Sequence, residues 1–325
     1  MVEPVKPFTS IRDQVEILRH RGLSLDRDEA ARWLEAVGYY RLSGYWYPYR
    51  ASGVNGPDDV FISGACFGDV VRLYEFDRKL RTLIHDGIER VEVALRSRVN
   101  YLIAEQDPLG YEIAGLFRPT FDHSGWLATA IGRVERARRH SEPIRHYEEK
   151  YGGRVPLWIL TEVLDFSDVS KLYDGMLARD QWMVAERLGV RVDENLLTTN
   201  QRKRAMKAHP LARWFEHLSI LRNSAAHHGR VWNRSFTPVG TAALRTIAGM
   251  ECLPDGQSER IFGALTVMGH LVQQASPGTT WSGKVRALVD GTFPDLPERS
   301  VAEMGFPEGW RSTPIWATRA PAVGG

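Results

Sequence analysis

The segment from Leu221 to Arg234 holds the residues of this chain that are best suited to chemistry. Arg222, Asn223 and His227 fall within about one and a half turns of a predicted helix, around the small residues 224–226. Asn223 and His227 are four residues apart, so we expect them to share a helix face on which the amide orients the imidazole. The long side chain of Arg222 can bend toward the same space.

Residues of these types suit the cleavage of a phosphodiester bond in RNA. The 2′-hydroxyl of RNA supplies the nucleophile, so neither a metal nor a cofactor is required. A histidine moves protons to or from the attacking and leaving oxygens, and an arginine stabilises the charge that builds on the phosphoryl oxygens. The expected catalytic residues are Arg222, Asn223, His227 and His228. The separate role of His228 stays open.

An arginine followed by a histidine after four to six intervening residues is by itself a weak signal, because other pairs in the chain also have it, among them Arg78 and His85, Arg133 and His140, and Arg204 and His209. We interpret those pairs as surface or core residues. The Arg222 segment differs in its asparagine, its double histidine and the Arg-x-Trp-Asn-Arg sequence that follows. The structural alternative is that Arg222 and His227 only cap or brace a helix end.

Further residues are candidates for RNA contact. They are cationic or amide side chains that follow the centre or lie on a long predicted helix: Arg230, Asn233, Arg234, Arg78 and Arg81. Arginines contact phosphates and an indole stacks on a base, but for Trp232 we favour a place in the core. The basic stretches 133–140 and 202–207 could bind the RNA backbone; solvated helix faces are the commoner explanation for such runs.

These residues are positioned by a chain that is helical almost throughout. Residues 68–105 carry the longest apolar stripe, in which Gly87 would permit a bend. The other predicted helices are 10–21, 26–37, 124–140, 156–177, 181–188, 211–228 and 258–274. The stripe consists of Val70, Leu73, Leu80, Ile84, Ile88, Val91, Leu95, Val99 and Leu102. No convincing alternating strand pattern is present, so the expected class is all-α, a helical bundle.

The rest of the chain is less regular. The aromatic segment Tyr39–Trp46 has no clear form, but packing onto the bundle is favoured for its rings over base stacking. Residues 51–59 are predicted to be a loop. Past Pro277 the chain is rich in Pro, Gly and Trp, and we expect it to wrap the surface.

Composition sets the broad class. The chain has 325 residues, is 43% hydrophobic and carries a net charge of +2, which is ordinary for a soluble globular protein and says nothing about nucleic acid. Cys66 and Cys252 are isolated, so neither a disulfide framework nor a structural metal is indicated. The first ten residues lack the apolar core of a signal peptide, and no stretch reaches the length of a membrane span. We expect a cytoplasmic protein without a membrane partner.

The segment from Leu221 to Arg234 resembles the signature of Abi-like proteins of the AbiD/AbiF type, which are abortive-infection proteins of prokaryotes. Further blocks are similar to this family and follow in its order: 21–23, 39–45, 73–81, 88–92, 156–158 with 162–163, 170–173 and 304–307. The resemblance spans nearly the whole chain. Asp165-Phe166-Ser167 departs from it, because Ser167 stands where family members often have glycine.

The resemblance implies a HEPN-type helical bundle with helical additions at both ends. We expect an N-terminal extension over residues 1–60, the HEPN-like core over 61–235, and a C-terminal helical and irregular extension over 236–325. It also implies a metal-independent endoribonuclease, acting in anti-phage abortive infection or as a toxin. The family's arginine and histidine correspond to Arg222 and His227. HEPN relatives pair their centres, so a homodimer is expected.

Two other functions remain open. The chain could be a catalytically silent RNA-binding or phage-sensing module that uses the same basic pocket. Cleavage of DNA is disfavoured, because DNA lacks the 2′-hydroxyl and the sequence shows no carboxylate metal cluster. By analogy with the family, an inhibitory small RNA or an antitoxin protein is a further partner. The sequence does not identify the RNA that is cut.

Overall fold

The computed structural model describes residues 5, 7–51, 60–296 and 298–317. Within these ranges the protein is all-α, apart from an antiparallel pair of short strands, β1 (Val239–Gly240) and β2 (Gln257–Ser258). The chain divides into an N-terminal unit, Met1–Leu80 with Ala287–Val301, and a C-terminal unit, Arg81–Arg286 with Ala302–Gly325. The boundaries expected after residues 60 and 235 stay a prediction. Of the loop predicted at 51–59, all but Ala51 lies outside the described residues.

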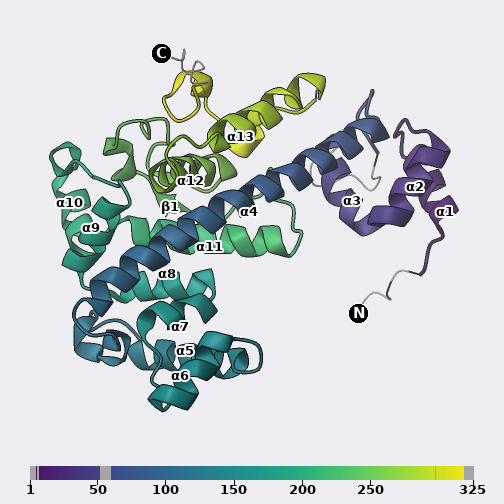
Figure 1. Cartoon of the computed structure of the whole chain (residues 1–325). Helices are drawn as coiled ribbons and strands as arrows, with labels where there is room; N and C mark the ends of the chain where they lie inside the picture. Colours follow the sequence, from purple (N-terminus) through teal and green to yellow (C-terminus); the bar gives the residue numbers. More distant parts are fainter. Residues whose placement is uncertain (1–4, 6, 52–59, 297, 318–325) are drawn as a thin grey trace, which may run out of the picture. The chain divides into compact units, whose positions relative to one another are not determined.

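The N-terminal unit begins with three helices, α1 (Ile11–His20), α2 (Arg27–Val37) and α3 (Tyr39–Trp46) (Figure 1). Ser10 and Asp26 cap the first two, since each side chain accepts a hydrogen bond from the backbone N–H three residues later. The aromatic segment Tyr39–Trp46, whose form the sequence left unclear, is helix α3. Its Tyr45 and Trp46 are buried, whereas Tyr40 is exposed, so the expectation that these rings pack holds for Tyr45 and Trp46 and not for Tyr40.

Helix α4 (Phe67–Ala104) is the longest helix of the described chain and contributes to both units. Every residue of the predicted apolar stripe is buried, which confirms the periodicity argument. A Cβ atom on Gly87 would lie 2.9 Å from the Trp281 ring, and the Trp281 indole N–H donates to the Leu83 carbonyl oxygen at 2.7 Å. Gly87 thus gives the indole of helix α13 (Trp281–Asp290) room to reach α4, a role the sequence analysis did not foresee.

Among the described residues after Pro277 several aromatic side chains are buried, so the expectation that this stretch wraps the surface holds only in part. Besides Trp281, both Trp310 and Trp316 are 1% exposed. Phe306 packs against Trp310, with ring centroids 4.7 Å apart. This region is built from α13 and short 3-10 helices, which lack the long periodic stripe from which burial can be inferred.

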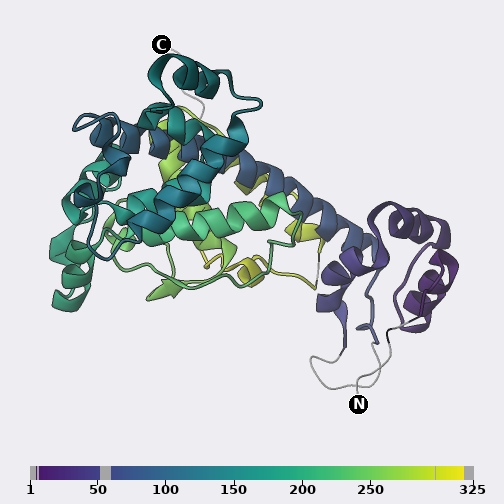
Figure 2. The same cartoon turned by 90° about the horizontal axis from the view of Figure 1, so that it is seen from below.

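The described part of the C-terminal unit has seven helices between α4 and the candidate site (Figure 1, Figure 2). They are α5 (His123–Ala137), α6 (Glu142–Tyr151), α7 (Leu157–Val163), α8 (Phe166–Gly175), α9 (Ala178–Arg187), α10 (Thr199–Lys207) and α11 (Leu211–Ala226). Helix α12 (Ile261–Ala275) is buried along almost its whole length.

Helix α11 packs against α8. Phe215 of α11 meets Phe166 and Tyr173 of α8, with ring centroids 6.3 Å and 5.3 Å apart. Aromatic side chains from both helices therefore form this seam. Residues of α4 come close to the C-terminal end of α11, where the candidate site lies.

None of the helices in the described ranges combines the length and the apolar character that a membrane span requires.

Candidate active site at the end of helix α11

The C-terminal end of helix α11 is closed by two backbone hydrogen bonds. The helix ends at Ala226. The N–H of His228 donates to the Ala225 carbonyl oxygen at 3.0 Å, and the N–H of Gly229 donates to that of Ser224 at 2.8 Å. This pairing is a Schellman motif, which satisfies carbonyl groups that the helix leaves without partners. The motif turns the chain sharply and places both histidines at the tip.

His228 takes the left-handed position of this motif, with φ +57°. In the described part of the chain it is the only residue other than glycine with a positive φ. The sequence analysis ended this helix at residue 228, two residues beyond its observed end at Ala226. A side chain with a Cβ atom is costly in this conformation. Backbone strain of this kind clusters at functional sites, so the exposed imidazole of His228 is a candidate functional group.

Two variants of His228 test the left-handed conformation. His228→Gly and His228→Ala both remove the imidazole, but only glycine adopts a positive φ without a steric penalty. We expect the glycine variant to be more stable by about 1 kcal/mol, measured by urea denaturation. The same pair of substitutions at His227, whose φ is −85°, is the control and is expected to lack this preference for glycine. A more stable alanine variant at position 228 would contradict the assignment.

Two arginines hold the turn after the histidines. A guanidinium N–H of Arg81 donates to the Gly229 carbonyl oxygen at 3.4 Å, and Arg81 is only 6% exposed. A guanidinium N–H of Arg234 donates to the Ser224 hydroxyl at 3.2 Å, and this guanidinium lies over the Phe236 ring. Both were candidates for RNA contact. Arg81 is too buried for that role and braces the turn, whereas Arg234 is exposed and has charge to offer a ligand.

The side chains of the predicted catalytic group differ in exposure. Asn223, His227 and His228 are exposed, and Arg222 is half-buried. A guanidinium N–H of Arg222 donates to the Asn223 amide oxygen at 3.3 Å. In the described part of the chain the Asn223 side chain makes this one hydrogen bond, and its amide makes none to the His227 imidazole. A charged donor makes the stronger hydrogen bond. Asn223 therefore positions the arginine, where the sequence analysis expected it to orient the histidine.

Arg222 lines a pocket of about 580 Å³ with residues from four helices and the loops between them. The pocket is rich in arginine. Its lining residues are Glu92 and Arg96 of α4, Arg133, Arg136 and Ala137 of α5, His140 and Ser141, Glu162 and Val163 of α7, Leu164, Asp165 and Arg222. Sequence spacing pointed to none of these neighbours of Arg222, because they come from stretches far apart in the chain.

The charges in this pocket are unequally satisfied. Arg133 is paired with Asp165 at 2.5 Å and Asp168 at 2.8 Å, and Arg96 is paired with Glu92. Arg136 is exposed and makes no ion pair with the residues that the structure describes. Together with Arg222, it leaves positive charge available to an anion. The solvated-face explanation of the stretch 133–140 is therefore incomplete, since this stretch forms one wall of the Arg222 pocket.

Glu92 is an acid in this basic pocket. Burial raises the pKa of the Glu92 carboxyl, and the charges of Arg96 and Arg222 oppose that rise. The carboxyl is thus a group whose proton affinity depends on Arg222. The sequence analysis did not single it out, because a glutamate on the polar side of a long helix is usually a solvated residue.

Trp232 and the remaining candidates for RNA contact make interactions within the protein. Trp232 is fully buried, as favoured, and Arg230 is half-buried. The Asn233 backbone carbonyl accepts a hydrogen bond from Arg260 at 2.8 Å. Arg78 belongs to the N-terminal unit, where its guanidinium pairs with Glu75 at 2.7 Å. Contact of Arg78 with RNA stays a prediction.

Three other histidines of the C-terminal unit are structural. His209, His217 and His270 are buried. Desolvation by burial lowers the pKa of all three, that of His209 to about 4. The ring of His209 accepts the Leu211 backbone N–H at 3.1 Å, which requires an unprotonated nitrogen. The core interpretation of the pair Arg204 and His209 is consistent with this.

The comparisons with known proteins agree with the resemblance seen in the sequence. Residues 32–233 match the family described as Abi-like protein. This range covers more than half of the chain and includes the end of α11, the Arg222 pocket and about half of the N-terminal unit. Searches of curated proteins and of solved structures gave no match.

Proposed function

Because the chain belongs to the Abi-like protein family, we propose that it acts in abortive infection against phage by cutting RNA. The proposed activity is that of a HEPN-type endoribonuclease, and the proposed centre is the end of helix α11. The observation that carries this proposal is the arrangement there. Two exposed histidines stand at a strained helix end, beside an arginine that lines a basic pocket.

The proposed reaction uses the RNA itself as the nucleophile. The 2′-hydroxyl attacks the adjacent phosphorus, and the bond from phosphorus to the 5′-oxygen of the next nucleotide breaks. The products are a 2′,3′-cyclic phosphate and a 5′-hydroxyl. His227 transfers a proton at one of the two oxygens. Arg222, held by the Asn223 amide, stabilises the charge on the non-bridging phosphoryl oxygens.

The second proton-transfer group is proposed to come from another copy of the chain. Ile220, Asn223, Ser224 and His227 recur at helical spacing, and none of them is buried. A two-fold contact along this face would bring each His227 opposite its own copy. The small residues 224–226 would let the two helices approach closely. Within one chain, Glu92 is the alternative source of the second group.

A mixing experiment separates these two sources. Wild-type and His227→Ala chains are combined under conditions in which subunits exchange, and cleavage is measured against the wild-type fraction. We expect inactive chains to suppress the wild type beyond dilution, with a dimeric mass by light scattering. Activity strictly proportional to the wild-type fraction would rule out the shared site and point to Glu92.

The competing proposal is a silent module that binds RNA or senses phage through the same basic pocket. Expression in a bacterial host distinguishes the two. The nuclease arrests growth, and His227→Ala abolishes the arrest at equal protein level. Arrest that persists in this variant would favour the silent module. An inhibitory small RNA or antitoxin protein remains part of the proposal, and it would be found by sequencing nucleic acid and identifying protein that copurify with the chain.

A further inference from the structure

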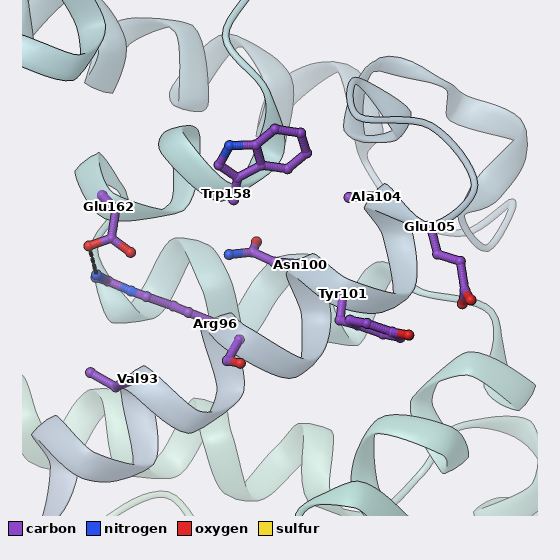
Figure 3. Close-up of a pocket in the computed structure, with 9 residues that line it drawn as sticks. Val93, Arg96, Asn100, Tyr101, Ala104, Glu105, Trp158 and Glu162 are labelled. Atoms are coloured by element: carbon purple, nitrogen blue, oxygen red, sulfur yellow. Dashed lines mark ion pairs between the residues drawn. The ribbon is translucent and has the colours of Figure 1, made fainter.

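The Arg222 pocket continues into two others of the C-terminal unit. Arg96 and Glu162 line both this pocket and a second one of about 670 Å³ (Figure 3). Trp158 lines both the second pocket and a third of about 450 Å³. The three pockets therefore adjoin one another and together define a stretch of surface that runs from Arg222 past Trp158. We call it the α4–α7 groove.

The groove has an unusual exposed aromatic side chain. Trp158 is 43% exposed, whereas the other tryptophans in the described part of the chain are buried or half-buried. Figure 3 shows its indole on one side of the second pocket, with Arg96, Asn100 and Tyr101 of α4 on the other side. The core of this unit uses other tryptophans, so packing does not explain an indole that faces an open pocket.

Other exposed aromatic rings line the second and third pockets. Tyr101 is 60% exposed, and the Arg187 guanidinium lies 5.0 Å from its ring centroid. Tyr151, in the third pocket, is 54% exposed and packs beside Tyr147 at 4.9 Å between centroids. Arg154 lines the same pocket. Exposed rings thus alternate with cations on the way from the candidate active site.

The two ends of the groove suit different parts of one ligand. At the Arg222 end, Arg96 and Arg133 are ion-paired. Arg136 and Arg222 make no ion pair with a carboxylate of the described residues. Phosphate groups are the natural partners of such arginines. Further along, the exposed rings offer faces on which bases can stack, and stacking requires bases that are not paired in a duplex.

We propose that the α4–α7 groove binds an unpaired stretch of RNA, with a phosphate between Arg136 and Arg222 and a base stacked on Trp158. This inference rests on the proposed function and specifies its substrate class as single-stranded RNA. The groove has no feature that requires a 2′-hydroxyl. Single-stranded DNA therefore binds in the same way and is not cut, whereas a duplex keeps its bases inside and does not occupy the aromatic part.

The test measures binding without cleavage. The probe is a fluorescent, fully 2′-O-methylated single strand of about twelve nucleotides, compared by anisotropy with the same strand in a duplex. We expect Trp158→Ala to weaken single-strand binding roughly five- to a hundredfold, and Trp158→Phe, which keeps a stacking ring, to weaken it only slightly. Duplex binding is expected to be unchanged. Tyr40→Ala, which removes an exposed ring of the N-terminal unit, is the control.

The phosphate end is tested by salt dependence. Arg136→Gln is expected to reduce the slope of log K against log salt by about 0.7, the value for one phosphate contact on a single strand. Arg191→Gln removes an exposed arginine outside the groove, which pairs with Glu186, and is expected to leave the slope unchanged. Thermal melts confirm that each variant is folded.

The outcomes separate this proposal from the proposed nuclease activity. If folded Trp158→Ala binds the single strand as the wild type does, the groove does not bind RNA and is left to a protein partner. If single-strand binding depends on Trp158 but the wild type cuts no RNA, the groove stands and the nuclease does not. If RNA is cut and neither cutting nor binding depends on Trp158, the nuclease stands and the groove does not.

Discussion

Replacing His227 with alanine is expected to abolish RNA cleavage and leave the protein folded. The imidazole is exposed, so its loss leaves no cavity in the core. Loss of a proton-transfer group typically reduces the rate about a hundredfold to ten-thousandfold. Cleavage of a labelled RNA under single-turnover conditions measures this effect, and a thermal melt shows that the fold is kept.

Arg222→Ala is expected to reduce cleavage by a similar factor, about a hundredfold to a thousandfold, because it removes charge stabilisation at the phosphoryl oxygens. Arg222→Lys keeps the charge but loses the fork that donates to Asn223, so we expect it to restore only part of the activity. Arg222 is half-buried beside Glu92, and its removal leaves that carboxyl with one neighbouring cation fewer. The melt of this variant is therefore a necessary control.

Matched histidine variants decide whether the effect is specific. His228→Ala is expected to reduce cleavage less than His227→Ala does, and His20→Ala, an exposed histidine of the N-terminal unit, is expected to have no effect. The reverse order at positions 227 and 228 would transfer the catalytic role to His228. Full cleavage by a normally folded His227→Ala variant would remove the end of α11 as the active centre.

A single hydrogen in place of the 2′-hydroxyl at the cut site is expected to stop cleavage completely. The proposed reaction has no other nucleophile, so the loss exceeds that of any protein variant. The substrate is one RNA with a deoxyribose only at the scissile position, compared with the same RNA carrying the deoxyribose one nucleotide away. The second substrate is expected to be cut normally, which shows that deoxyribose does not impair binding.

The same reaction is expected to proceed in excess EDTA, with products that end in a 2′,3′-cyclic phosphate and a 5′-hydroxyl. Treatment with a 5′-kinase before and after phosphatase identifies these ends. A 5′-phosphate on the downstream fragment would indicate that water is the nucleophile. Cleavage of the deoxyribose-containing substrate at the scissile position, or a strict need for magnesium in the chemical step, would contradict attack by the 2′-hydroxyl.

The features that sequence alone determined are those set by neighbours along the chain. The apolar stripe of α4 was predicted residue by residue, since a period of 3.6 residues fixes which side chains share a helix face. The all-α class followed from the same periodicity. The group of Arg222, Asn223 and His227 could be identified because its members lie within two turns of one helix. Arg204 and His209 could likewise be set aside because no such group surrounds them.

Only the tertiary structure decided what surrounds this group. Glu92, Arg136 and His140 join Arg222 in one pocket, although up to 130 residues separate them from it in the chain. Their approach depends on how α4, α5 and α11 pack, and no local pattern encodes it. The same holds for Trp281, which lies against Gly87 because the start of α13 packs on α4.

His228 and Arg81 have other roles than the sequence suggested, and the cause is again the packing of distant segments. The left-handed position of the Schellman motif falls on His228 and not on Gly229. Helix α11 ends at Ala226, one residue earlier than it would if the glycine took that position. Arg81 looked like an exposed cation on the polar side of α4, but the turn after the histidines buries it. Residue types and spacing determine which groups can do chemistry, whereas desolvation and charge pairing, which decide their roles, arise only when distant segments pack together.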